Sequence, residues 1–193
     1  MSTPADDGTI VIASVEDPER FGTLVERHHP AVHRYLARRV GVDHADDLAA
    51  ETFAVAFRRR ATYDGRPQAL PWLLGIATRL AQRLRRDEVR ALRAYARTGI
   101  DPFSPSHDLA ADDRLDAAAL APELAGALAA MRTNHREALL LCAVGGLTPD
   151  EAGRALDVPP ATIRSWLFRA RATARRRLPA PTTTTSLSPE DVR

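Results

Sequence analysis

Arginine side chains gather near the C-terminal end of the chain, and no acidic residue interrupts them. Residues 158–178 contain six arginines, and the hydroxyl side chains of Thr162 and Ser165 lie among them. Guanidinium groups bind phosphates and guanine edges through paired hydrogen bonds, and hydroxyl groups hold phosphate oxygens. These residue types therefore predict non-covalent contacts with a nucleic acid.

The residues around this stretch predict two short helices that would present the arginines on one surface. Residues 148–151 have the pattern of a capping box, and residues 157–159 predict a turn. Ile163, Leu167 and Ala170 would mark the inner face of the second helix. The outer face would present Thr162, Arg164, Ser165, Arg169 and Arg171. This arrangement is typical of a helix-turn-helix in the DNA major groove, and the cap and turn favour it over an ordinary exposed basic helix.

The composition favours an all-helical protein without a catalytic centre. The chain has 193 residues, and 45% hydrophobic but only 5% aromatic residues indicate a core of Leu, Ala and Val. A single cysteine, Cys142, excludes an internal disulfide and a cysteine-based zinc site. His29 and His33 have a spacing that can hold a metal, but Pro30 disturbs the helix between them, so we expect neither metal nor cofactor. No enzyme motif, leader or membrane span stands out, so we expect a cytoplasmic protein that is not an enzyme.

Helical periodicity and turn-forming residues divide the chain into two small helical domains. The first would contain three helices, the last of them running without a break over about 71–96. A segment with one glycine and two prolines then predicts a flexible linker. The expected division is a disordered lead-in (1–16), a first domain (17–97), a linker (98–108), a second domain with the helix-turn-helix (109–178) and a disordered tail (179–193).

Three segments together resemble a known family. They are ADDLAAETFAVAFRRRATYD at 45–64, LPWLLGIATRLAQRLRR at 70–86 and LTPDEAGRALDVPPATIRSWLFRARATARRRL at 147–178. They are similar to the extracytoplasmic-function class of bacterial RNA polymerase sigma factors, over about 21–97 and 120–178. The order of the segments and the short linker between the two blocks make the resemblance specific.

The resemblance implies a partner for each block. Core RNA polymerase, through its β′ clamp helices and β flap, and promoter DNA are the implied partners, and the sequence leaves an anti-sigma factor open. The β′ clamp helices would meet Asp46, Asp47, Leu48 and Glu51. The minus-ten element would meet Arg58, Arg59, Arg60, Tyr63, Arg79, Arg83, Arg86 and Arg90. The minus-thirty-five element would meet Thr162, Arg164, Ser165, Trp166, Arg169 and Arg171.

Some positions depart from the family pattern and leave alternatives open. Arg79 stands where the family usually has Asn, and Ala50 stands where Gln is common. Trp166 replaces an expected arginine, and it could contact a base or pack inward. Tyr63 is a candidate for stacking on an unstacked base, whereas Trp72 fits the core better. A degenerate sigma-like interaction module and a stand-alone helix-turn-helix regulator remain as alternatives to a sigma factor that opens promoters.

Overall fold

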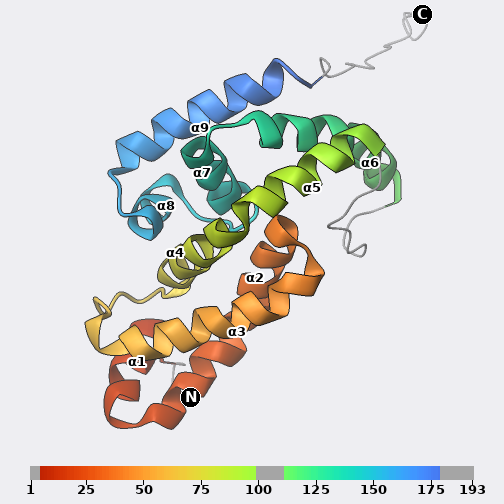
Figure 1. The fold of residues 1–193 in the computed structure, drawn as a ribbon. Helices are drawn as coiled ribbons and strands as arrows, with labels where there is room; N and C mark the ends of the chain where they lie inside the picture. Colours follow the sequence, from red (N-terminus) through yellow and green to blue (C-terminus); the bar gives the residue numbers. More distant parts are fainter. Residues whose placement is uncertain (1–4, 99–110, 179–193) are drawn as a thin grey trace, which may run out of the picture.

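The computed structural model describes residues 5–98 and 111–178, with only the backbone described for residues 85–87 and 111–120. The regular elements of these residues are all helices, which confirms the predicted all-helical class with two domains. None of these helices has the length and apolar composition that crossing a membrane requires. The expected tail, and all but the first residue of the expected linker, lie outside the described residues. Figure 1 shows α1 (Asp7–Glu16), α2 (Phe21–Val40), α3 (Val42–Arg59), α4 (Leu70–Ala81), α5 (Arg85–Thr98), α6 (Ala111–Ala130), α7 (Thr133–Ala143), α8 (Pro149–Leu156) and α9 (Pro160–Arg175).

The N-terminal domain is built on the helix pair α2 and α3. Gly41 joins the two helices with a φ of 86°, which a residue with a side chain rarely adopts. The pair buries Leu24 and Leu36, and α4 adds Leu73, and each of these three side chains is fully buried. The apolar faces that the periodicity predicts therefore meet in one interior.

The prediction of a disordered lead-in is wrong for residues 7–16, which form α1. Asp6 caps this helix, because its carboxylate accepts a hydrogen bond from the amide of Thr9 at 2.8 Å. The buried carboxylate of Asp7 accepts from the Ala69 amide at 2.9 Å and pairs with Arg27 at 2.6 Å and with His28 at 2.7 Å. These partners lie far along the chain, so local sequence gives no sign that the segment is anchored.

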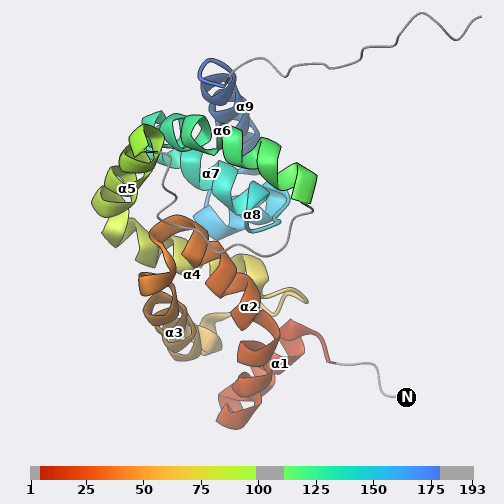
Figure 2. The ribbon, with the colours of Figure 1, turned by 90° about the vertical axis from the view of Figure 1, so that its right-hand side faces the viewer.

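The basic helix expected over 71–96 is divided into two. A 3-10 turn, Gln82–Leu84, separates α4 from α5. Helix α4 stays in the N-terminal domain, whereas α5 continues outward and packs along α6 (Figure 2). The turn therefore carries the second half of this basic segment to the C-terminal domain.

The C-terminal domain ends in the predicted helix-turn-helix. The hydroxyl of Thr148 accepts from the Glu151 amide, and the Glu151 carboxylate accepts from the Thr148 amide at 2.8 Å, which lowers the pKa of Glu151. Asp157 ends α8 in the left-handed conformation with a φ of 58°. Ile163 and Leu167 then fix α9 against the core, as the periodicity predicts.

The two domains pack against each other through small residues on α4 and on the C-terminal domain. A Cβ atom at Gly75 would lie 2.6 Å from the carbonyl oxygen of Ala155 on α8. A Cβ atom at Gly145, which follows α7, would lie 2.8 Å from a methyl group of Leu74. Both views of the fold place α4 between α2 and the helices of the C-terminal domain. At Gly75 the missing side chain allows two backbones to approach closely, and at Gly145 it leaves room for the Leu74 side chain.

A buried group of four charged side chains also joins the domains, and we call it the interdomain charge cluster: Arg39, Glu88, Arg136 and Glu137. Arg39 pairs with Glu137 of α7 at 2.6 Å and with Glu88 of α5 at 3.5 Å. Arg136 of α7 pairs with Glu88 at 3.3 Å. Each of these side chains is at most 2% exposed. Burial raises the pKa of Glu88, and the two guanidinium groups only partly offset this effect.

Arg39 connects this cluster to the interior of the N-terminal domain. Its Nη1 donates to the Tyr35 hydroxyl at 2.9 Å, and that hydroxyl lies 2.7 Å from the hydroxyl of Thr78. Because the Tyr35 oxygen accepts from Arg39, its own proton is available to Thr78. The ion pairs between the domains are therefore held by a polar chain that reaches α4.

Candidate nucleic-acid and polymerase interfaces

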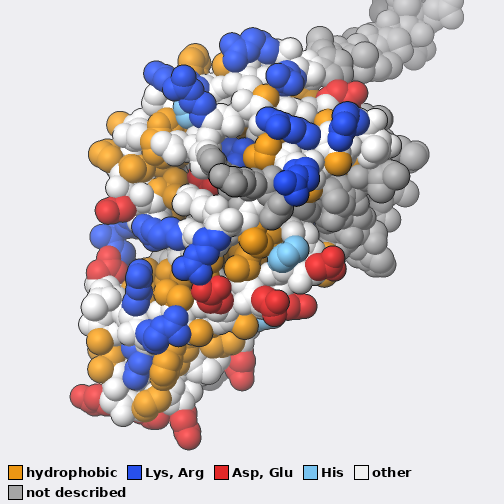
Figure 3. Space-filling model, in the orientation of Figure 1, with side chains coloured by type: hydrophobic (Ala, Val, Ile, Leu, Met, Phe, Trp, Pro, Cys, Tyr) orange, Lys and Arg blue, Asp and Glu red, His pale blue; other side chains and the backbone are white. Residues whose placement is uncertain are grey.

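The outward face of α9 carries most of the residues that we predict to read the minus-thirty-five element. Arg164, Ser165, Arg169 and Arg171 are exposed, whereas Thr162 is half-buried at one edge of the face. Figure 3 shows basic side chains gathered over α9. The structure therefore brings the predicted arginines together on one accessible helix face.

The arginines of this face form few ion pairs with other described residues of the protein. Arg164 lies 3.9 Å from Asp150, and both side chains are more than half exposed. In the described part of the chain, no carboxylate forms an ion pair with Arg169 or Arg171. An exposed pair at this distance contributes little stability, so these guanidinium groups can meet phosphates at small cost.

Two aromatic residues of α9 differ in their surroundings. Trp166 is half-buried and packs against the hydrophobic core, which answers part of the question that the sequence left open. Phe168 is 68% exposed, although it was not among the residues predicted from the sequence. Its position three residues after Ser165 places it on the same outward face, and this spacing could have revealed it. An exposed aromatic ring between arginines suits apolar contact with thymine methyl groups.

The arginines that end α3 are not equivalent. Arg58 and Arg59 are exposed. Arg60 instead donates to the carbonyl oxygens of Ser14 at 3.0 Å and Phe57 at 2.7 Å. Its guanidinium also lies 3.8 Å from the centre of the Phe57 ring. Arg60 therefore ties α1 to α3, and the predicted minus-ten surface has two exposed arginines at this point.

An aromatic cavity lies beside the loop that joins α3 to α4. The rings of Tyr63 and Trp72 lie 4.8 Å apart and form part of its wall. The Tyr63 hydroxyl donates to the carbonyl oxygens of Arg66 at 2.9 Å and Gln68 at 3.1 Å, and burial with nearby Asp64 raises the pKa of Tyr63 to about 12. The cavity has a volume of about 230 Å³, and Arg154 of α8 lines it from the other domain. Trp72 is half-buried and packs against the hydrophobic core, and it also lines the cavity.

The remaining arginines of the predicted minus-ten surface lie in the last turn of α4 and in the segment that follows it. Arg79 and Arg90 are exposed, and the side chain of Arg86 lies outside the described residues. Arg83 pairs with Glu51 of α3 at 3.0 Å, with both side chains well exposed. This exposed ion pair connects the predicted DNA surface to the predicted polymerase surface.

The predicted polymerase surface occupies the first half of α3. Asp46 is 78% exposed and lies 3.1 Å from His33, and Asp47 is exposed beside it. Leu48 is only 9% exposed and belongs to the core, so the expectation that part of its side chain would be available to a partner is wrong. Its buried position follows from the helical period, because Leu48 lies on the same face as Ala45 and Thr52. The available surface is therefore acidic: Asp46, Asp47 and Glu51.

Comparisons with known proteins match both parts of the chain. The family model of sigma-70 region 2 matches residues 24–98, and that of sigma-70 region 4 matches residues 122–173. The ECF RNA polymerase sigma factor SigC of Mycobacterium tuberculosis is 30% identical over 174 residues, which cover 88% of this chain and 91% of that protein. The sigma factor CarQ of Myxococcus xanthus is 34% identical over 147 residues, which cover 76% of this chain and 82% of CarQ.

Solved structures show the same fold. CnrH in complex with the cytosolic domain of CnrY matches with a TM-score of 0.63 at 21% identity, over 88% of this chain and 95% of that one. RpoE from Bartonella quintana, solved with the anti-sigma factor NepR, matches with a TM-score of 0.56 at 21% identity, over 81% of this chain and 94% of that one. The two family models together match more than half of the chain, in the order expected from the sequence. The chain belongs to the extracytoplasmic-function sigma factors of bacterial RNA polymerase, which recognise promoters and initiate transcription.

Proposed function

We propose that this sigma factor meets promoter DNA through two surfaces and core polymerase through a third. The outward face of α9 reads the upstream element, the aromatic cavity and nearby arginines act at the minus-ten element, and the acidic surface of α3 binds the β′ clamp helices. The C-terminal domain also meets the β flap. The chain carries no covalent chemistry of its own and works beside polymerase in the cytoplasm. The exposed arginines of α9 are the observation that carries the proposal.

Transcription with purified components tests the function as a whole. The full chain is mixed with core polymerase and genomic fragments, and the start sites of the transcripts are mapped. Discrete new start sites support the proposed function. Core binding without initiation would favour an interaction module, and DNA binding without core binding would favour a stand-alone regulator.

The double substitution Arg164→Ala/Arg169→Ala tests the upstream surface. We expect weaker binding to the upstream element, and the slope of log affinity against log salt should fall by about one for each phosphate that the protein no longer binds. The matched control is Arg34→Ala/Arg38→Ala, which removes two exposed arginines from α2. A salt slope unchanged by the α9 substitutions would contradict their binding to phosphates.

The aromatic cavity is proposed to hold an unstacked base of the minus-ten element. Stacking on an aromatic ring is worth about 1–3 kcal/mol per base, which offsets part of the energy of opening the duplex. Tyr63→Leu removes the ring, whereas Tyr63→Phe removes only the hydroxyl that holds the loop at Arg66 and Gln68. With 2-aminopurine in the non-template strand, we expect Tyr63→Leu to reduce the opening signal more than Tyr63→Phe. Equal signals would rule out stacking on Tyr63.

Charge reversal tests the polymerase surface. The substitution Asp47→Arg/Glu51→Arg should weaken core binding while leaving the helical circular dichroism intact, because both side chains lie on the outside of α3. Glu26→Arg, an exposed reversal on α2, is the control. Full core affinity in the α3 variant would refute the assignment.

An anti-sigma factor is proposed as a further partner. CnrH was solved with the cytosolic domain of CnrY, and RpoE with NepR, and both share the fold of this chain. Such a partner would have to cover at least one of the three proposed surfaces. Competition between it and core polymerase for the α3 surface is the expected signature.

A further inference from the structure

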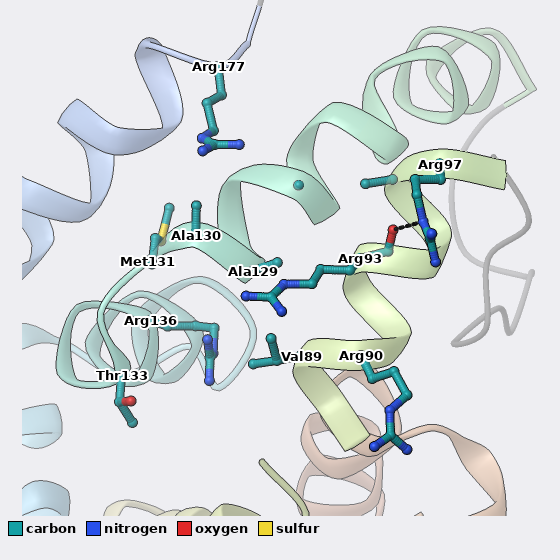
Figure 4. Close-up of a pocket in the computed structure, with 12 residues that line it drawn as sticks. Val89, Arg90, Arg93, Arg97, Ala129, Ala130, Met131, Thr133, Arg136 and Arg177 are labelled. Carbon is teal, nitrogen blue, oxygen red and sulfur yellow. Dashed lines mark hydrogen bonds between the residues drawn. The ribbon is translucent and has the colours of Figure 1, made fainter. Parts of the chain in front are cut away.

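A cavity of about 930 Å³ lies where the two domains meet at α5, and we call it the arginine cavity. Its wall is formed by α5, α6, the start of α7 and Arg177, which follows α9 (Figure 4). No carboxylate lines it in the described part of the chain. The arginines that line it are Arg90, Arg93, Arg97, Arg136 and Arg177.

Several of these arginines have no compensating charge among the described residues. The charge of Arg136 is balanced by Glu88, but no described carboxylate pairs with Arg93, Arg97 or Arg177. Figure 4 shows the Arg93 side chain extending from α5 toward Ala129 and Arg136, while Arg177 enters the same space from the end of α9. Like charges that converge on one space repel each other, and an anion between them removes that repulsion.

Arg136 gives the cavity a fixed anchor. It is 2% exposed, and it donates to the Leu128 carbonyl oxygen at 3.4 Å and to Glu88 at 3.3 Å. Its buried Nε, however, has no hydrogen-bond partner within the residues that the structure describes. A guanidinium that is already held in place loses little freedom when a ligand binds, which favours affinity.

We propose that the arginine cavity binds a nucleoside polyphosphate. Arg93, Arg136 and Arg177 would hold the phosphates, since guanidinium groups suit phosphate oxygens. The apolar side chains of Val89, Ala129 and Met131 also line the cavity and would receive the nucleoside. The volume lies within the range of roughly 300–1,000 Å³ that is usual for cofactor sites. Arg93, Arg136 and Arg177 come from α5, from α7 and from the residues after α9, and they line one hollow.

Binding at this place would couple the ligand to the arrangement of the domains. Arg93 lies in the part that matches sigma-70 region 2, and Arg136 lies in the part that matches region 4. The complete site therefore exists only while the domains are packed together. A ligand that binds one arrangement shifts the equilibrium toward it, so the nucleotide should oppose separation of the domains.

Titration calorimetry on the full chain tests the proposal. The ligands are ATP, GTP and inorganic tripolyphosphate, without magnesium, so that the phosphates keep their full charge. We expect saturable binding of one nucleotide per chain, tighter than that of tripolyphosphate. No saturable binding would overturn the proposal, and equal affinity for tripolyphosphate would overturn its nucleoside part.

Two variants and one competitor locate the site. Arg93→Ala/Arg177→Ala changes two exposed residues and should weaken binding by about tenfold for each guanidinium removed. The control Arg34→Ala/Arg38→Ala should leave the affinity unchanged. Equally weakened binding in both variants would mean non-specific charge and would overturn the site. A short single strand of DNA that displaces the nucleotide at the same phosphate concentration would assign the cavity to nucleic acid instead.

Discussion

The interior of the N-terminal domain and the contact between the two domains are stabilised by different chemistry. The interior buries aliphatic side chains such as Leu24, Leu36 and Leu73. The contact combines close packing at Gly75 and Gly145, and buried apolar side chains such as Leu74, with the interdomain charge cluster. Aliphatic side chains gain nothing from water, whereas Arg and Glu recover their hydration as soon as they are exposed. The charged part of the contact therefore loses less when the domains separate than the aliphatic interior loses when it is exposed to water.

The largest loss of folding stability is expected in the interior. Leu73→Ala removes a fully buried side chain of α4 and should lower the free energy of unfolding by about 2–5 kcal/mol. Urea denaturation followed by circular dichroism measures this decrease. Val42→Ala, at a side chain that is 42% exposed, is the control and should change it by less than about 0.5 kcal/mol. Similar decreases in the free energy of unfolding for Leu73→Ala and Val42→Ala would contradict the idea that the aliphatic interior provides most of the stability.

Arg39→Met tests the contact between the domains. With the domains packed, it would leave Glu137 and Glu88 without their common partner, which costs about 3–5 kcal/mol. Separation of the domains avoids most of that cost by returning both carboxylates to water. We therefore expect a larger radius of gyration in small-angle X-ray scattering, with helix content unchanged, whereas Arg38→Met should stay compact. An Arg39 variant as compact as the parent would mean that the cluster does not hold the domains together.

Asp7 is a buried charge within one domain, and its pH dependence sharpens the comparison. Burial raises the pKa of Asp7, but the Ala69 amide, Arg27 and His28 outweigh this and hold it below its ordinary value of 3.8. The folded pKa is thus lower than the unfolded one, so the stabilisation is complete above about pH 4 and disappears as the pH falls through the folded value. The protection of the Ala69 amide, measured by NMR as its exchange rate relative to the intrinsic rate at each pH, should fall over this acidic range. In Asp7→Asn the amide should lose most of this pH dependence, and an unaltered profile would exclude Asp7 as its cause.

The smallest effect is expected at the surface. Glu51→Gln breaks the exposed pair with Arg83 and should change the free energy of unfolding by no more than about 1 kcal/mol. Core binding should fall measurably in the same variant, if Glu51 contacts polymerase. A large decrease in the free energy of unfolding would mean that the Glu51–Arg83 pair stabilises the fold as much as a buried group does, which its exposure does not predict.

Local patterns predicted the helix-turn-helix, and long-range pairing explains what they missed. The capping box at Thr148 and Glu151, and the periodic Ile163 and Leu167, are contained within a few residues, so the sequence was enough to predict α8 and α9. The partners in the ion pair of Arg39 with Glu137 are 98 positions apart, and no local rule relates them.

The candidate sites show the same limit. Arg60 is the same residue type as Arg58 and Arg59 and directly follows them in the sequence. Its side chain nevertheless donates a hydrogen bond to the carbonyl oxygen of Ser14, on a helix that the sequence did not predict. Phe168, by contrast, lies in a helix whose inner face was known, so its exposure could have been read from its spacing. Residue type predicts the chemistry that a surface can have, but the packing of the helices decides which side chains are exposed on that surface.

Gly75 is a position where one added methyl group would change the contact between the domains. Glycine is unfavourable inside a helix by roughly 0.5–1 kcal/mol relative to alanine, so Gly75→Ala strengthens α4 taken alone. The same methyl group would lie 2.6 Å from the Ala155 carbonyl oxygen and drive α8 away. The same substitution therefore has two opposite effects: it stabilises α4, and it weakens the packing of the two domains against each other. A graded series of side chains at this position would work as a wedge of adjustable width, spreading the domains without altering any charge.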